Sequence, residues 1–182
     1  MTARLNHIIL MAGGRGTGKT TFALKLIQAS PKKSLIIDTL DHPAYRNYPV
    51  VTLEKLRLWK SGTYRIFEGD PVSIMNEVNR HVWNANIILE DAFKYLSPNM
   101  KKDEIRLFID CKQHNQDIII MFHALAQIPP TLIRLADKLV IFKTKEQLAA
   151  RNNRFYNWDE IYFAHQRVMR HANPHYCEAI SL

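Results

Sequence analysis

A glycine-rich segment near the start of the chain constrains the fold more than any other stretch. Residues 13–20 read Gly-Gly-Arg-Gly-Thr-Gly-Lys-Thr, which fits the pattern G-x-x-x-x-G-K-S/T. An apolar run at 7–12 precedes the segment and a helical pattern at 21–27 follows it, as the strand-then-helix context of this pattern requires. The glycines let the backbone point its N–H groups at phosphate oxygens, with the positive end of the following helix behind them. The segment therefore predicts a site for a nucleoside triphosphate rather than a simple glycine-rich β-turn.

Two side chains of this segment have distinct expected roles. Lys19 is expected to reach the β- and γ-phosphates of ATP, and the Thr20 hydroxyl is expected to be a ligand of Mg²⁺. ATP and Mg²⁺ are therefore the cofactors that the sequence predicts. The residues expected to bind the nucleotide are Gly13, Gly14, Arg15, Gly16, Thr17, Gly18, Lys19, Thr20 and Thr21.

Apolar runs of strand length alternate with helical patterns along the chain. We expect strands at about 5–12, 34–39, 63–67, 86–89, 117–122 and 138–143, with a further short strand at 50–53. The expected helices lie at about 18–29, 71–82 and 101–115, with a short one around 132–135. This alternation indicates βαβ crossovers. It predicts the α/β class, a three-layer P-loop NTPase fold with a mainly parallel central sheet and helices on both faces.

The chain length indicates a single unit. No internal repeat or flexible linker interrupts the 182 residues, so we expect one ATPase domain over 1–182 with a helical C-terminal extension at about 145–182. The loop at 40–49 should lie near the carboxyl edge of the sheet, where α/β sheets bind their ligands. Tyr45 or Arg46 could contact the nucleotide there, although a packed surface loop is the simpler interpretation.

Two adjacent carboxylates end a buried apolar strand. Residues 86–89 read Asn-Ile-Ile-Leu, and Glu90 and Asp91 follow them. Neighbouring side chains of a strand point to opposite sides, so one carboxylate can face Mg²⁺ while the other faces an attacking water. We assign Glu90 to the metal and Asp91 to the water, with the reverse order left open. Two solvated acids at a strand end are the alternative interpretation.

The strongest strand pattern of the sequence, at 117–122, ends in His123. If this strand lies beside the acidic strand, the imidazole is placed to sense the γ-phosphate of the nucleotide. A histidine that is merely hydrogen-bonded is the alternative.

Composition restricts the partners and the compartment. The formal net charge of +8 favours an anionic partner besides the nucleotide. Basic and aromatic residues are interleaved between 151 and 170, which suits nucleic acid or, alternatively, an amphipathic helix packed on the sheet. The two cysteines lack metal or framework spacing, and there is neither room for a signal peptide nor an apolar stretch of the ~20 residues that span a bilayer. We therefore expect a cytoplasmic protein without a membrane span.

The order of four segments resembles the HerA/FtsK superfamily of DNA-translocating ATPases. These segments are the glycine-rich loop at 13–20, the acidic strand at 87–91, and residues 111–120 and 128–134. The resemblance covers about residues 5–145. Within the superfamily it points to the small viral genome-packaging ATPases and to the zonula-occludens-toxin-like assembly ATPases of filamentous phages.

Some positions depart from the pattern of that superfamily. Lys112 stands where the family usually has an arginine, and His123 stands where it usually has a glutamine. Gln127 lies four residues further on, so the sensor is open between His123 and Gln127. The acidic pair reads Glu-Asp where the family commonly has Asp-Glu, which leaves the catalytic base open between Glu90 and Asp91.

The resemblance implies a homo-oligomeric ring, a pentamer or a hexamer, that hydrolyses ATP and moves DNA without regard to its sequence. In such rings one subunit inserts an arginine into the site of its neighbour, which can contribute about 10³–10⁵ in rate. Arg134, which matches a recurrent family arginine, and Arg106 are the candidates for this residue. A viral packaging ATPase would also meet a capsid vertex or portal, in the host cytoplasm or in the virion.

Two other functions share these motifs. A phage-extrusion ATPase of the zonula-occludens-toxin-like group would need a separate membrane anchor, because its relatives tend to carry a transmembrane segment after the ATPase domain. A small nucleoside or nucleotide kinase has a similar length and the same phosphate loop, and it would need a pocket for the acceptor.

Overall fold

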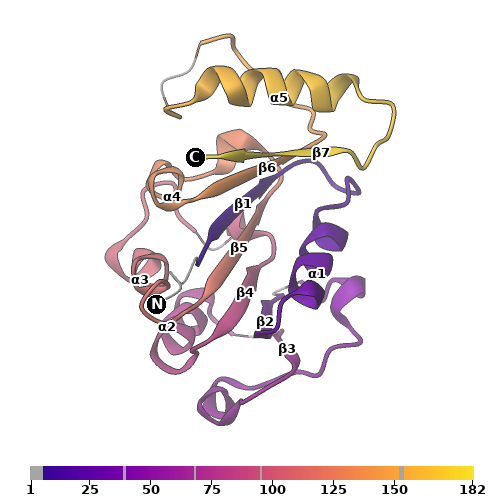
Figure 1. The fold of residues 1–182 in the computed structure, drawn as a ribbon. Helices are drawn as coiled ribbons and strands as arrows, with labels where there is room; N and C mark the ends of the chain where they lie inside the picture. Colours follow the sequence, from indigo (N-terminus) through magenta and orange to yellow (C-terminus); the bar gives the residue numbers. More distant parts are fainter. Residues whose placement is uncertain (1–5, 39, 68, 95, 152–153) are drawn as a thin grey trace.

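The computed structural model describes residues 6–38, 40–67, 69–94, 96–151 and 154–182, which fold around one central sheet (Figure 1). The strands are β1 (Ile8–Ala12), β2 (Lys33–Ile37), β3 (Thr63–Ile66), β4 (Ala85–Leu89), β5 (Asp117–Phe122), β6 (Lys138–Phe142) and β7 (Cys177–Ser181). The helices are α1 (Lys19–Ala29), α2 (Pro71–His81), α3 (Lys102–Asp110), α4 (Pro130–Leu135) and α5 (Trp158–Arg170). Residues 5 and 39, at the ends of two expected strands, lie outside the described residues.

The strand order of the sheet is β3-β2-β4-β5-β1-β6-β7. The first six strands are parallel, and β7 pairs antiparallel with β6 at one edge. Strand β5 lies between β1 and β4, with Ile120 in register with Leu10 on one side and Leu89 on the other. The segments that follow β1, β4 and β5 therefore meet at one edge of the sheet. These segments are the glycine-rich loop, the acidic pair and His123.

Helices cover both faces of the sheet, which confirms the three-layer arrangement. Ala23 of α1 is buried in a cluster that contains Ile88 of β4. Buried apolar side chains from each of α2, α3, α4 and α5 belong to a second cluster, which contains the adjacent strand residue Ile87. Ile87 and Ile88 point to opposite faces because they are neighbours in one strand. Figure 1 shows α1 on one side of the sheet and α2, α3 and α4 on the other. Burial from both sides explains why the central strands are continuous apolar runs.

Two stretches before the C-terminal segment differ from the expectation. Residues 50–53 do not form a strand, because Val50 makes only an isolated bridge to Arg65 and a 3₁₀ helix, η2 (Leu53–Leu58), follows. Helix α3 ends at Asp110 rather than near 115. A turn at 111–115 follows, and its last residue, Asn115, has a positive φ of 54° where the chain enters β5.

The C-terminal segment is not helical throughout. Helix α5 packs against β6 and β7, and the chain returns as the antiparallel edge strand β7. Phe155 and Trp158 are buried in the core cluster, as the amphipathic-helix interpretation expects, whereas Tyr156 and Phe163 are exposed. Both cysteines are free thiols. Among the described residues, no helix combines the length and apolar character needed to cross a bilayer.

Candidate nucleotide-binding site

The loop between β1 and α1 is tied to the ends of both neighbouring strands. The Gly13 N–H donates to the Phe122 carbonyl of β5 at 3.2 Å, and the Gly14 N–H donates to the Lys143 carbonyl after β6 at 2.7 Å. Only glycine fits at position 13 without displacement, because a Cβ there would lie 2.5 Å from the Cβ of Phe142. The loop is therefore held at the edge of the sheet that also carries the acidic pair.

The Lys19 side chain is folded over this loop. It is 7% exposed, and its Nζ donates to the carbonyls of Gly13 at 2.7 Å and Gly14 at 2.8 Å. Burial lowers the pKa of Lys19, while the charges of Glu90 and Asp91 raise it. The Lys19 ammonium is therefore held by the loop carbonyls and attracted by the negative charges of Glu90 and Asp91.

The two carboxylates after β4 face different partners. Glu90 is buried and accepts a hydrogen bond from the Tyr45 hydroxyl at 2.5 Å. Burial raises the pKa of Glu90, whereas the Tyr45 hydrogen bond and the Lys19 charge act in the opposite direction. Asp91, also buried, has a φ of 54° and pairs with Nε2 of His123 at 2.6 Å. Their burial rules out the interpretation of two solvated acids.

The end of β5 carries the two residues considered as sensors. The imidazole of His123 lies against Asp91 and is about one-third exposed, at 32%. Gln127 has another contact, because its Oε1 accepts the backbone N–H of His123 at 3.0 Å. The structure thus brings the His123 side chain to the acidic pair, while the Gln127 amide holds the backbone of the loop after β5.

Glu146 and Arg154 of the C-terminal segment, which together we call the clamp, hold the loop that follows β5. The Glu146 carboxylate accepts the backbone N–H groups of Leu125 at 2.6 Å and Ala126 at 2.8 Å. The Arg154 guanidinium donates to the carbonyls of Ala126 at 3.3 Å and Ile128 at 2.5 Å. Sequence reasoning missed this clamp, because its partners are far apart in the chain and follow no local pattern.

Replacing Glu146 by alanine should destabilise the protein. The change leaves the N–H groups of Leu125 and Ala126 without their charged acceptor, and such a loss costs about 1–3 kcal/mol. Urea denaturation measures the free energy of unfolding directly. The neighbouring Gln147 is exposed, so the control Gln147→Ala should change that free energy by less than about 0.5 kcal/mol. Equal values for the two variants would contradict the clamp.

A buried ion pair shapes the loop after β2. Asp38 is fully buried, accepts the backbone N–H of His42 at 2.9 Å, and lies 3.4 Å from the Arg65 guanidinium. The loop so formed sends Tyr45 into the core, where it is fully buried, and brings His42 to the cavity described next. Arg46, the other residue considered in this loop, is exposed and does not line that cavity.

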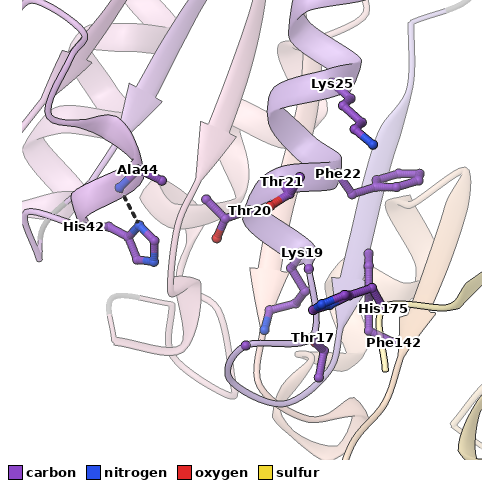
Figure 2. A pocket seen from close by; sticks show the side chains of 12 residues that line it. Thr17, Lys19, Thr20, Thr21, Phe22, Lys25, His42, Ala44, Phe142 and His175 are labelled. Atoms are coloured by element: carbon purple, nitrogen blue, oxygen red, sulfur yellow. Dashed lines mark hydrogen bonds between the residues drawn. The ribbon is translucent and has the colours of Figure 1, made fainter. Parts of the chain in front are cut away.

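A cavity of about 510 Å³ opens along the glycine-rich loop and the first turns of α1 (Figure 2). Its lining residues are Gly16, Thr17, Gly18, Lys19, Thr20, Thr21, Phe22, Lys25, His42, Ala44, Phe142 and His175. In Figure 2, His42 and Ala44 lie on one side of Thr20, and Phe22, Phe142 and His175 lie on the other. The size and the mixture of polar and aromatic groups suit a nucleotide.

His175 is a lining residue that sequence reasoning missed. It belongs to the turn between α5 and β7, and its Nδ1 would lie 3.4 Å from a Cβ placed on Gly18. Beside it, the rings of Phe22 and Phe142 meet edge to face with centroids 5.7 Å apart. The aromatic side of the cavity is thus built from α1, β6 and the C-terminal turn. Lys25 and His42 were missed as well.

A second cavity, of about 730 Å³, shares Thr17 with the first. Its lining residues are Gly14, Arg15, Thr17, His123, Ala124, Lys143, Thr144, Lys145 and Glu146. The residues predicted to bind the nucleotide therefore divide into groups. Residues 16–21 line the first cavity, Gly14 and Arg15 line the second, and Gly13 anchors the loop.

The two candidate arginines lie away from both cavities. Arg134 is on α4 and Arg106 is on α3, and both are exposed. The Arg106 Nε lies 3.6 Å from Asp110, one turn further along the helix. Neither side chain lines either of these two cavities, and Arg106 lines a separate cavity together with Arg80, Trp83 and Asp110.

Comparison with known proteins supports the fold. No family model matches the sequence, and no curated protein matches it either. The DNA-packaging ATPase B204 from Sulfolobus turreted icosahedral virus has a TM-score of 0.68 to this chain, with 98% of each chain covered and 14% sequence identity. The chain has the fold of a P-loop ATPase. B204 of Sulfolobus turreted icosahedral virus 2 has been solved with ATPγS, AMPPCP and AMP, so that protein binds nucleotides.

Two further solved structures share this P-loop fold. The N-terminal domain of zonular occludens toxin from Neisseria meningitidis has a TM-score of 0.50, 12% identity and 78% coverage of each chain. A KaiC-like protein from Pyrococcus horikoshii has a TM-score of 0.51 and 12% identity, with 78% of this chain and 74% of that chain covered. At these identities the likeness shows the fold. It confirms the P-loop ATPase fold implied by the resemblance to the HerA/FtsK superfamily.

Proposed function

We propose that this protein is an ATP-hydrolysing DNA translocase that packages a viral genome and acts as a ring. One observation carries the proposal: the glycine-rich loop, two buried carboxylates and His123 meet at one sheet edge, with His123 paired to Asp91. This arrangement provides a phosphate site and a carboxylate that can orient water. The fold shared with B204, a DNA-packaging ATPase, supports the choice of DNA as the moved polymer.

The oxygen donors at this edge fit Mg²⁺. The Glu90 carboxylate accepts the Tyr45 hydroxyl, and the Thr20 side chain acts to lower the pKa of the same phenol, which burial raises, so two groups of the type that Mg²⁺ prefers lie near each other beside the phosphate loop. Mg²⁺ usually takes one or two protein ligands and completes its shell with phosphate oxygens and waters. When bound, the ion would neutralise charge on the β- and γ-phosphates.

The reaction then follows from the remaining groups. A water oxygen attacks the γ-phosphorus, the bond to the β–γ bridging oxygen breaks, and ADP and phosphate leave. Asp91 orients the water and accepts its proton, and Lys19 offsets the negative charge of the γ-phosphate. His123 would respond to the presence of the γ-phosphate through its contact with Asp91. The Gln127 amide would hold the backbone of the loop that follows β5.

Assembly into a pentamer or hexamer would complete the site. Arg134 or Arg106 of one subunit would enter the site of the next, so that hydrolysis depends on the ring. Basic side chains facing the centre of the ring would contact DNA phosphates, which makes binding indifferent to sequence and steeply dependent on salt. In this role the ring would sit at a capsid vertex or portal, in the host cytoplasm or the virion.

A phage assembly ATPase is the second candidate, because the zonular occludens toxin domain shares the fold. Flotation of the purified protein with lipid vesicles separates the two. The packaging proposal expects the protein to stay at the bottom of the gradient, and stable flotation would favour the assembly ATPase.

A nucleotide kinase is tested by the fate of the γ-phosphate. Phosphate release from ATP in the absence of any nucleoside or nucleotide acceptor is the result that the translocase proposal expects. ADP formation that requires an added acceptor would overturn it in favour of a kinase.

A further inference from the structure

Tyr45 belongs to none of the sequence motifs that predict the site, although its loop was expected to lie near the nucleotide. It ends the short 3₁₀ helix η1 (Pro43–Tyr45), and its side chain is fully buried. The ring belongs to the core cluster on the α1 face of the sheet, together with Ile36 of β2 and Ile88 of β4. The ring thus packs as a core residue does, and its hydroxyl emerges at the acidic edge of the sheet.

The hydroxyl contacts Glu90, one of the two residues assigned to Mg²⁺. It donates to Oε2 of Glu90 at 2.5 Å, and the side chain of Thr20, the other assigned residue, lies near enough to lower the pKa of the phenol against the rise that burial causes. Thr20 belongs to the first turn of α1, while Glu90 follows β4. One phenol oxygen therefore bonds Glu90 and lies beside Thr20, two residues that come from separate elements.

Hydrogen bonds fix the backbone around Tyr45. Its N–H donates to the His42 carbonyl at 2.9 Å, and its carbonyl accepts the N–H of Tyr48 at 2.9 Å. The buried Asp38 carboxylate holds the start of this loop through the N–H of His42. Because the ring is enclosed and its backbone is fixed at several points, the hydroxyl has a defined position from which to orient its partners.

We infer that Tyr45 is a positioning residue that sets the orientation of Glu90 for Mg²⁺ binding. Hydrogen-bonding partners of metal ligands fix the ligand atoms in the geometry that the ion needs, and losing such a partner costs about 10–100-fold in metal affinity. The inference rests on the proposed Mg²⁺-dependent ATPase function and assigns a new residue to its site.

The test is Tyr45→Phe, which keeps the buried ring and removes the hydroxyl. The readout is binding of the non-hydrolysable analogue AMPPCP at increasing Mg²⁺, compared with binding in EDTA. We expect unchanged affinity in EDTA and a Mg²⁺ requirement raised by about 10–100-fold. The control is Tyr48→Phe, a half-buried tyrosine in the same loop, which should keep the wild-type Mg²⁺ dependence.

A double-mutant cycle separates positioning from a general structural effect. In a Glu90→Gln background, Tyr45→Phe should cause no further change in Mg²⁺ dependence, because the carboxylate that it positions is gone. For a variant of lowered stability, the same comparison can be made from unfolding temperatures. The measured quantity is the rise in unfolding temperature that Mg²⁺ causes in the presence of AMPPCP. A wild-type Mg²⁺ requirement in Tyr45→Phe would overturn the inference alone. AMPPCP binding without any Mg²⁺ dependence in the wild type would overturn the proposed function as well.

Discussion

Lys19→Ala should abolish ATP hydrolysis. The Lys19 ammonium is buried at the glycine-rich loop, 2.7 and 2.8 Å from two loop carbonyls, and it is expected to face the β- and γ-phosphates of the proposed site. Removing one such group that stabilises developing charge costs about 10²–10³ in rate, and weaker nucleotide binding adds to the loss. Phosphate release under saturating ATP measures the effect.

The matched control for Lys19→Ala is Lys138→Ala. Lys138 is exposed at the start of β6, so it lies at the amino ends of the strands, whereas the loop lies at their carboxyl ends. Its replacement should leave basal hydrolysis at the wild-type rate. Circular dichroism of both variants checks that each remains folded. Basal hydrolysis that survives Lys19→Ala would show that the loop is not the catalytic phosphate site.

Asp91→Asn should stop hydrolysis while leaving nucleotide bound. Asn has the size of Asp and also tolerates the left-handed backbone at this position, where φ is 54°. The variant therefore loses the charge that accepts the proton of water but keeps the fold. Loss of a general base costs about 10²–10⁴ in kcat. Single-turnover hydrolysis and AMPPCP titration separate the two steps.

Glu90→Gln is the companion variant that decides the order of the two carboxylates. If Glu90 holds Mg²⁺, its replacement should raise the Mg²⁺ requirement for AMPPCP binding, whereas Asp91→Asn should not. The opposite pair of outcomes would exchange the two roles. The distinct partners of the carboxylates, Tyr45 for Glu90 and His123 for Asp91, are the reason to expect separate effects.

The parts of the site that could be predicted from the sequence are those that depend on local pattern. The glycine-rich loop could be predicted from its residue spacing, because its glycines and Lys19 all lie within one short turn of the backbone. The acidic pair and His123 each end an apolar strand. They meet because β5 lies between β1 and β4, and parallel strands bring their carboxyl ends to one edge.

The parts that sequence reasoning missed depend on contacts between distant segments. Asp38 and Arg65 form a buried pair across two strands, and that pair shapes the loop that carries Tyr45. His175 reaches Gly18 because the chain returns after α5 as an antiparallel edge strand. Only Ile180 is buried in β7. A strand of this kind gives little periodic signal, and the segment was expected to be helical.

The C-terminal segment has a consequence for how the site works. His175 contributes to the first cavity, while Glu146 and Arg154 hold the loop that follows His123. The segment after β6 therefore contacts both the nucleotide cavity and the loop beside the acidic pair. A shift of this segment would therefore move residues at the cavity and at the loop together.

Ring action is tested by ATP hydrolysis against protein concentration, with and without DNA, for the wild type, Arg134→Ala and Arg106→Ala. A ring motor should show a rate per subunit that rises with concentration and with DNA. One of the two arginine variants should lose about 10³-fold or more, as a residue acting between subunits should. A rate per subunit that is independent of concentration and DNA, and equal in all three proteins, would contradict a ring motor with shared sites.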